Sequence, residues 1–254
     1  WVWAEASGLE QLASNVPIEA HSISAPAQIT FLGGQQIIER DADSGDLKPI
    51  VALPGVSVNE LISLSGGRTL LSTTDGRLLL LELDDGQEGL GGIGARPPEW
   101  QVMELTSGLG DVHGMCVSSD ERALFLAIGE EVLRAPMNEG RLEAMPAHFA
   151  STAPSASGAL TTDAQRNLYV CTEEGVVVFD EGADRLLSIS TQGVASGVCF
   201  GCFGGSTLST LFIGCDDNSL WALPTKVQGS DASRSFKFLR NIEKQVQAQR
   251  HDGW

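Results

Sequence analysis

A strand-rich unit recurs five times along this chain of 254 residues. The copies begin at Glu19, Asn59, His113, Ser157 and Ser196, so their starts are 40, 54, 44 and 39 residues apart. This spacing fits about four short strands in each copy, as in the blades of a β-propeller, whose repeats are roughly 40 to 50 residues long. We therefore predict an all-β fold, a five- or six-bladed β-propeller of four-stranded antiparallel blades.

The residue that opens each copy lies where the innermost strand of a blade begins. Radial repetition brings these positions together around one shared axis, although they are far apart in the sequence. Glu19, Asn59, His113 and Ser157 are therefore the candidate residues of a central pocket.

The repeats also predict the domain organisation. Residues 1–229 form one propeller, in which a short strand within residues 1–17 completes the last blade, so that terminal strands close the ring. Residues 230–254 form an edge strand followed by a short peripheral helix or a tail, because SFKFL alternates and NIEKQVQAQR contains good helix formers. The long interval after Asn59 contains GQEGLGGIGARPP, a loop that either covers the pocket or lies on the surface, and EWQVMELTSG then supplies an outer strand.

The charge of the chain limits its partners. A formal net charge of −17 repels phosphate backbones and anionic membranes, so nucleic acid is not expected to bind. The segment from Lys226 to Trp254 is nevertheless basic, with six Lys or Arg against three Asp or Glu. This tail either folds back on the acidic body or docks on an acidic protein partner.

Several other classes of protein lack support in the sequence. No run of about 18 apolar residues predicts a transmembrane helix, and no basic segment followed by an apolar one is read at the N-terminus. We expect a soluble protein that resides in the cytosol or in the lumen of an organelle. The sequence does not indicate which of these compartments it occupies. The five cysteines lack a disulfide framework and are expected to be buried apolar residues, although Cys199 and Cys202 have CxxC spacing. GxSxG, HExxH and phosphate-loop motifs are absent.

Four segments resemble one family of propellers. EAHSISAPAQITF is similar to the EGPxWxxxxxxLxF opening of the SMP-30/gluconolactonase/luciferin-regenerating-enzyme-like family, and HGMCVSSDERALFLA resembles its NGxAxSPDxxxLYxA blade. SGALTTDAQRNLYVCTEEGVVVFD resembles DGxAxDxxGNLWVAxxxGVxVFD, and GVCFGCFGGSTLSTLFI resembles CxFGGxxxxTLYxT. The resemblance covers most of residues 19 to 224 and implies six blades, of which five full repeats are counted here.

The resemblance also implies a divalent metal on the axis. In the family the metal is held by the Glu of the first motif, the Asn of the second and the Asp of the third, and a further Asn meets the substrate. Glu19 matches the Glu and Asn59 matches the further Asn, whereas His113 replaces the metal-binding Asn and Ser157 replaces the Asp. Loss of an anionic ligand weakens a calcium site, while a pair of Glu19 and His113, with His21 as a possible third ligand, suits zinc. Alternatively, both histidines are hydrogen-bonded residues of the pocket or core.

Two functions of different kinds follow from these observations. The first is a divergent metal-dependent hydrolase of lactones or small esters, with calcium or zinc polarising the carbonyl and Asn59 orienting the substrate. The second is a catalytically degenerate propeller that serves as an interaction or assembly subunit, with protein partners at its acidic body or basic tail. A binder of small ligands that contains no metal is a third alternative.

Overall fold

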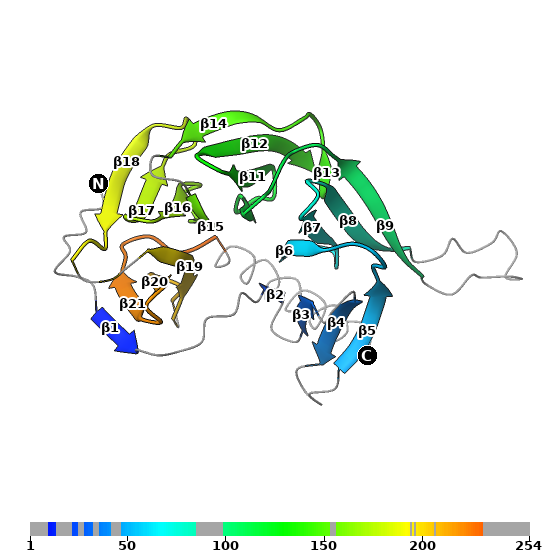
Figure 1. Cartoon of the computed structure of the whole chain (residues 1–254), viewed down its shortest axis with the longest axis horizontal. Coiled ribbons are helices and arrows are strands. Elements are labelled where there is room, and N and C mark those ends of the chain that lie inside the picture. Colours follow the sequence, from blue (N-terminus) through cyan, green and yellow to red (C-terminus); the bar gives the residue numbers. More distant parts are fainter. Residues whose placement is uncertain are drawn as a thin grey trace, which may run out of the picture.

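The computed structural model shows antiparallel sheets that follow one another around a common centre (Figure 1). It describes residues 10–13, 22–24, 28–32, 36–41, 47–84, 99–152, 156–193, 195, 197–205 and 207–230. Within these ranges there is no α-helix, and consequently no helix long and apolar enough to cross a membrane.

The described residues form five sheets, and consecutive strands pair as hairpins. The first sheet contains β2 (Ser22–Ser24), β3 (Gln28–Leu32), β4 (Gln36–Asp41) and β5 (Leu47–Ala52). The second contains β6 (Val58–Ser63), β7 (Thr69–Thr73), β8 (Leu78–Asp84) and β9 (Glu99–Thr106).

The remaining three sheets continue around the centre. The third contains β10 (Gly114–Val117), β11 (Ala123–Ile128), β12 (Glu131–Asn138), β13 (Arg141–Leu142) and β14 (Ala147–Ser151). The fourth contains β15 (Ala156–Thr162), β16 (Leu168–Thr172), β17 (Gly175–Phe179) and β18 (Arg185–Ser190). The fifth contains β19 (Val198–Gly204), β20 (Thr210–Cys215), β21 (Leu220–Pro224) and β1 (Glu10–Ala13), and β1 pairs with β21.

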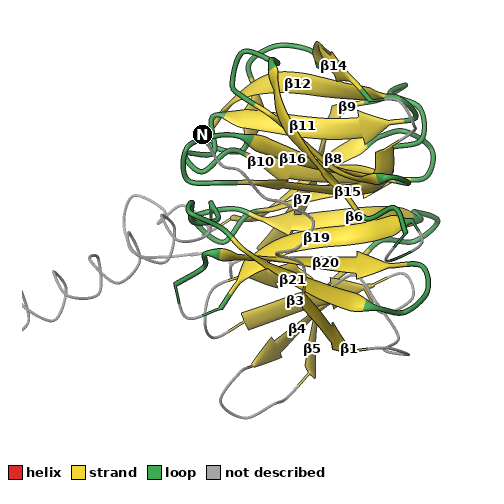
Figure 2. Ribbon diagram, turned by 90° about the vertical axis from the view of Figure 1, so that its left-hand side faces the viewer, coloured by secondary structure: helices red, strands yellow, loops and turns green. Residues whose placement is uncertain are grey.

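The first strand of each sheet lies nearest the centre. Strands β2, β6, β10, β15 and β19 are neighbours in this order, so successive sheets meet along their inner strands. Figure 2 shows the sheets from the side, with the turns gathered at both ends of the strands. The segment that leads into β10 lies beside the start of β6 on one side and the start of β15 on the other.

The core lies between adjacent sheets. Strands β7, β16 and β17 are buried along their whole length, because each sheet packs on a neighbour through both faces. One apolar cluster joins the second sheet to the third, and others join the third to the fourth and the fourth to the fifth. Continuous apolar runs such as LYVCT and GVVVF are therefore required here, where a sheet with one wet face would alternate.

Aspartate side chains hold several hairpin turns. Asp163 is fully buried, and its carboxylate accepts hydrogen bonds from the backbone N–H groups of Gln165 and Asn167 at 2.8 and 2.9 Å. Asp120 and Asp180 accept backbone N–H groups in the same way in their own turns. Part of the acidic composition therefore serves the geometry of the turns.

These observations confirm the predicted all-β propeller and the outer strand at EWQVMELTSG, which is β9 paired with β8. The number of blades in the complete chain, including the family's six, stays a prediction, because four sheets have most of their side chains described and β2–β5 is described mainly by its backbone. The division into residues 1–229 and 230–254 also stays a prediction. The long loop at 86–98 and the expected strand and helix after Asp231 lie outside the described residues.

The cysteines differ in part from expectation. Cys116, Cys171 and Cys215 are buried, and Cys199 is half-buried. Cys202 on β19 is exposed, so the prediction that all five are buried is wrong for this residue. None of the five forms a disulfide.

Candidate functional site

The site is built where β6 begins. Val58 pairs with Thr73 and Glu60 pairs with Ser72, so Asn59 is an extra residue in a β-bulge. A bulge re-aims the side chain that it carries and is common beside binding sites. It turns the exposed amide of Asn59 towards the loop that leads into β10.

That loop is tied to Asn59 by two hydrogen bonds. The Nδ2 atom of Asn59 donates to Oδ1 of Asp111 at 3.0 Å and to the carbonyl oxygen of Val112 at 3.1 Å. Because both amide protons are directed at the loop, the carbonyl oxygen is the part of Asn59 that can accept a hydrogen bond from a ligand. Asn59, on the second sheet, therefore positions the carboxylate of Asp111, which lies in the loop that leads into the third sheet.

His113 completes the cluster from the start of β10. Its Nδ1 atom lies 3.8 Å from Oδ2 of Asp111, and the two side chains are 42% and 61% exposed. The backbone of His113 donates to the carbonyl oxygen of Ala127 at 2.9 Å, and the neighbouring Val112 is fully buried. The imidazole and the carboxylate are thus presented to solvent from a loop whose backbone is anchored.

The backbone of the fourth sheet closes one side of this cluster. A β-carbon built on Gly114 would lie 1.1 Å from the carbonyl oxygen of Gly158, and one built on Gly158 would lie 2.5 Å from the carbonyl oxygen of His113. Gly158 has a φ of +111°, a conformation that favours glycine. Strands β10 and β15 therefore approach each other so closely that neither position accommodates a side chain.

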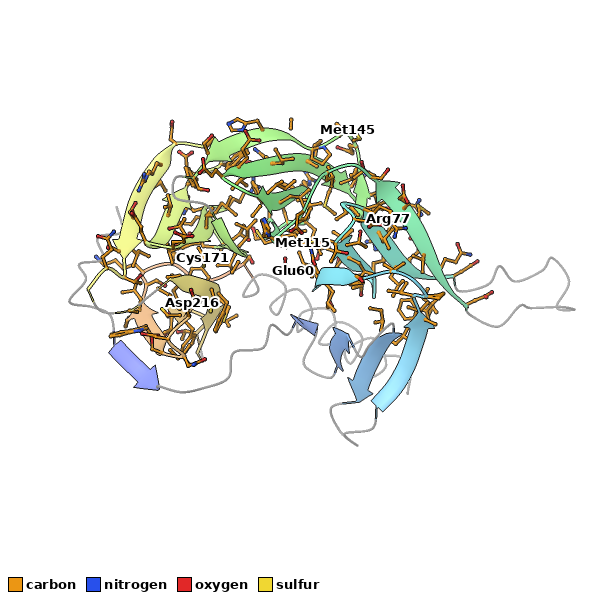
Figure 3. All side chains as sticks on the ribbon, viewed as in Figure 1. Glu60, Arg77, Met115, Met145, Cys171 and Asp216 are labelled. Carbon is orange, nitrogen blue, oxygen red and sulfur yellow. The ribbon has the colours of Figure 1, made fainter. Side chains whose placement is uncertain are left out.

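A half-buried glutamate, Glu60, lies beside the cluster. The backbone N–H of Met115 in β10 donates to Oε2 of Glu60 in β6, and Figure 3 shows both residues near the centre of the ring. Removal of the carboxyl from water raises the pKa of Glu60 to about 8, and the hydrogen bond from Met115 opposes this only in part. At neutral pH Glu60 is therefore mainly uncharged.

This burial predicts a stability that falls as the pH rises. The carboxyl of Glu60 titrates near 4.5 in the unfolded chain and near 8 in the folded one. Between these values the unfolded chain loses a proton that the folded chain keeps, so the free energy of unfolding decreases with pH and levels off above pH 8. Glu60 keeps part of its surface in water, which limits the effect. We therefore expect the free energy of unfolding to fall by about 1–3 kcal/mol between pH 5.5 and 8.5.

Urea unfolding of Glu60→Gln at the two pH values tests this expectation. Glutamine keeps an acceptor for the backbone N–H of Met115 but does not titrate. The free energy of unfolding of the variant should therefore fall by about 1–3 kcal/mol less than that of the wild type over this pH range. Glu104→Gln, an exposed position on β9, is the matched control and should follow the wild type. An equal loss in Glu60→Gln and the wild type would contradict the assignment.

The structure brings together only some of the residues singled out in the sequence. Asn59 and His113 share one cluster, whereas Glu19 and His21 lie outside the described residues. Ser157 is the second residue of β15, next to Gly158, and its side chain is also outside what the structure describes, so its role stays a prediction.

Sequence reasoning missed Asp111 and Glu60. Asp111 stands two residues before His113, and Glu60 directly follows Asn59. The available signal was an acidic residue within two positions of each predicted pocket residue. This signal is weak because the chain contains 33 Asp and Glu residues.

The described residues of this cluster offer a metal ion few donors. Among the described residues no three His, Cys, Asp or Glu side chains form a group that could hold one. Asp111 and His113 supply two donors, and Asn59 directs its N–H groups, which cannot ligate a cation, at Asp111. Catalytic zinc usually needs three protein ligands and calcium six to eight oxygens, so these residues do not fit a resident metal by themselves.

Comparisons with known proteins complete this description. No family model matches the chain, and no curated protein matches it in sequence. Solved structures do match. A gluconolactonase from Xanthomonas campestris is 20% identical, with 78% of this chain and 68% of that chain covered and a TM-score of 0.59.

Two further structures are similar. Regucalcin from Agrobacterium tumefaciens, described as a calcium-binding protein, is 16% identical over 82% of this chain and 76% of that chain, with a TM-score of 0.62. A luciferin-regenerating enzyme is 14% identical over 87% and 96%, with a TM-score of 0.50. At these identities the similarity establishes a shared fold. The resemblance inferred from the motifs is thus confirmed at the level of the fold.

Proposed function

We propose, from the fold shared with gluconolactonase and regucalcin, that the chain is a divergent hydrolase of small lactones or esters. The observation that carries this proposal is the pair of Asp111 and His113, 3.8 Å apart, which Asn59 holds at the start of the inner strands. A carboxylate beside an imidazole is a common arrangement for activating water towards a carbonyl.

Each member of the cluster has a distinct role in this proposal. The Nδ1 atom of His113 lies 3.8 Å from Oδ2 of Asp111, and in the proposed mechanism this contact shortens on substrate binding so that the carboxylate holds the ring in place. The other ring nitrogen, Nε2, removes a proton from water as the water attacks the carbonyl carbon of the substrate, and the proton then passes to the leaving alkoxide. Asn59 holds Asp111 and offers its carbonyl oxygen to a hydroxyl group of the substrate.

Electrostatics favour an uncharged substrate. The chain carries a net charge of −17, and the carboxylate of Asp111 is exposed beside the reacting position. Both features repel anions. The carboxylate product is therefore bound less well than the neutral substrate. A neutral lactone or ester, opened to a carboxylate that is then expelled, is consistent with this field.

A pH-stat assay of the full chain with neutral lactones and esters tests the function. Gluconolactone and unsubstituted five- and six-membered lactones make up the panel, with simple aryl esters as a second class. We expect turnover of at least one lactone above the rate in buffer, and we expect no stimulation by polyanions. A chain that accelerates none of these substrates would contradict the proposal.

One divalent ion, calcium or zinc, remains part of the proposal. Its support is the family pattern at Glu19, with Asp111 and His113 as the described donors and His21 as a further candidate. When bound, such an ion polarises a carbonyl oxygen. An ion bound to Nε2 of His113 would take the place of the general-base role given above, so the metal-dependent and metal-free forms of the proposal are alternatives at this nitrogen.

Elemental analysis decides whether the metal is present. The purified protein, prepared without chelator, is expected to contain about one equivalent of metal, and Glu19→Gln is expected to lose it because calcium and zinc both bind through a carboxylate at this position. Glu104→Gln should retain the wild-type content. If the wild-type protein contained no metal, the metal-dependent form of the proposed mechanism would be wrong. The role of His113 would then be tested separately.

A further inference from the structure

Two adjoining pockets, both open to solvent, lie between the third sheet and the fourth. Their volumes are about 470 and 250 Å³, and both are lined by Arg122, Arg134 and Glu181. Arg122 belongs to the turn that follows β10, whereas His113 immediately precedes β10. This space, here called the arginine cavity, is therefore at the opposite end of the strand from the cluster described above.

The charges of the arginine cavity are not balanced. Arg166 lies 3.3 Å from Oδ2 of Asp120 and 3.2 Å from Oε1 of Glu181, and Arg134 lies 3.7 Å from the same oxygen of Glu181. The guanidinium of Arg122 forms no ion pair with any residue that the structure describes. Three arginines thus face two carboxylates, and one positive charge, on Arg122, is left for a ligand.

Arg134 is held in place by its neighbours. Its guanidinium carbon lies 5.8 and 5.9 Å from the ring centroids of Phe125 and Phe149, and its Nη1 donates to the carbonyl oxygen of Glu181 at 3.1 Å. The two rings contact each other edge to face at 5.2 Å. Phe149 and Ala183 also line the larger cavity and add an apolar wall beside the charged one.

We propose that the arginine cavity binds a small monocarboxylate with a flat apolar body. The carboxylate pairs with the exposed guanidinium of Arg122, whose planar fork matches a carboxylate in two parallel hydrogen bonds. The body packs on Phe149 and Ala183. A dianion would exceed the single charge left over, and an uncharged molecule would leave Arg122 unpaired. The site needs no reaction at the axis, so it stands independently of the proposed hydrolase.

Calorimetric titration with benzoate tests the site in the full chain. Benzoate combines one carboxylate with one ring, and benzamide is the uncharged molecule of the same shape. We expect saturable binding of benzoate and binding of benzamide that is at least about tenfold weaker, as expected for the loss of a charged hydrogen bond. Arg122→Gln should weaken benzoate by about tenfold or more, and Arg122→Lys by less.

Arg141→Gln is the matched control. Arg141 is exposed on β13 and forms its ion pair with Glu82 at 2.7 Å, away from the cavity. Its variant should bind benzoate within about twofold of the wild type. Thermal melts show whether each variant is folded. We expect both to fold, because Arg122 and Arg141 are exposed. The proposal is overturned if the wild type shows no saturable binding, or if Arg122→Gln binds benzoate as Arg141→Gln does.

Discussion

Gly114→Ala is expected to destabilise the protein by about 3–5 kcal/mol, which for a chain of this size lowers the melting temperature by roughly 10 °C or more. A β-carbon at this position would lie 1.1 Å from the carbonyl oxygen and 2.3 Å from the carbonyl carbon of Gly158. These are backbone atoms of an inner strand, so no side-chain rotation relieves the overlap. The third and fourth sheets must separate, and the apolar cluster between them loses contact.

Urea and thermal unfolding of Gly193→Ala give the comparison. Gly193 has a φ of +81° with no heavy atom within 4 Å of a β-carbon built there, so alanine meets only the backbone cost of about 1–2 kcal/mol. If Gly114→Ala were no more destabilising than Gly193→Ala, the close approach of β10 and β15 would be wrong. The expected order distinguishes an overlap between two sheets from a general intolerance of substituted glycines.

His113→Gln is expected to lower kcat/KM for the best lactone by about 10²- to 10⁴-fold, the range typical of a lost general base. Glutamine keeps polarity and approximate size but cannot accept a proton at neutral pH. Since the side chain of His113 is 42% exposed and its backbone holds the loop, we expect the fold to be unaffected. Steady-state kinetics in a pH-stat, with circular dichroism of each variant, measure the effect.

His148→Gln is a closely matched control for this experiment. His148 is also exposed, and its Nδ1 lies 3.9 Å from a carboxylate oxygen of Glu131, but it belongs to β14, which lies at the outer edge of the third sheet (Figure 1). Its variant should keep activity within about twofold, as expected for a surface substitution. Added imidazole should restore part of the activity of His113→Ala, whose missing ring leaves an exposed space. Equal effects of the two glutamine variants, or no rescue, would remove His113 from the mechanism.

Much of the fold could be predicted because its signal is local and repeated. Runs such as LYVCT and GVVVF, separated by turn residues at regular intervals, indicate buried strands in successive sheets, and β16 and β17 occupy these segments. The repeat also predicted that Asn59 and His113 stand at the start of inner strands. Turn chemistry contributed in the same way, since Asp163 holds a hairpin through its own neighbours in sequence.

The contents of the site were harder to predict because they depend on pairs that are far apart in the chain. Asn59 meets Asp111 across 52 residues, and Glu60 meets the backbone of Met115 across 55. No periodicity constrains which polar side chain occupies such a position. A bulge of one residue also decides where the amide of Asn59 points, and a bulge leaves little trace in a single sequence.

The sequence by itself therefore determined the repeated strands, their antiparallel hairpins and the meeting of the inner-strand starts, because these follow from local patterning. Only the tertiary structure decided which side chains and backbones touch between sheets. The contact of Gly114 with Gly158, the desolvation of the Glu60 carboxyl and the absence of an ion pair at Arg122 among the described residues all arise there. The physical reason is that packing between blades depends on distances of a few tenths of an ångström between residues that the strand pattern leaves unrelated.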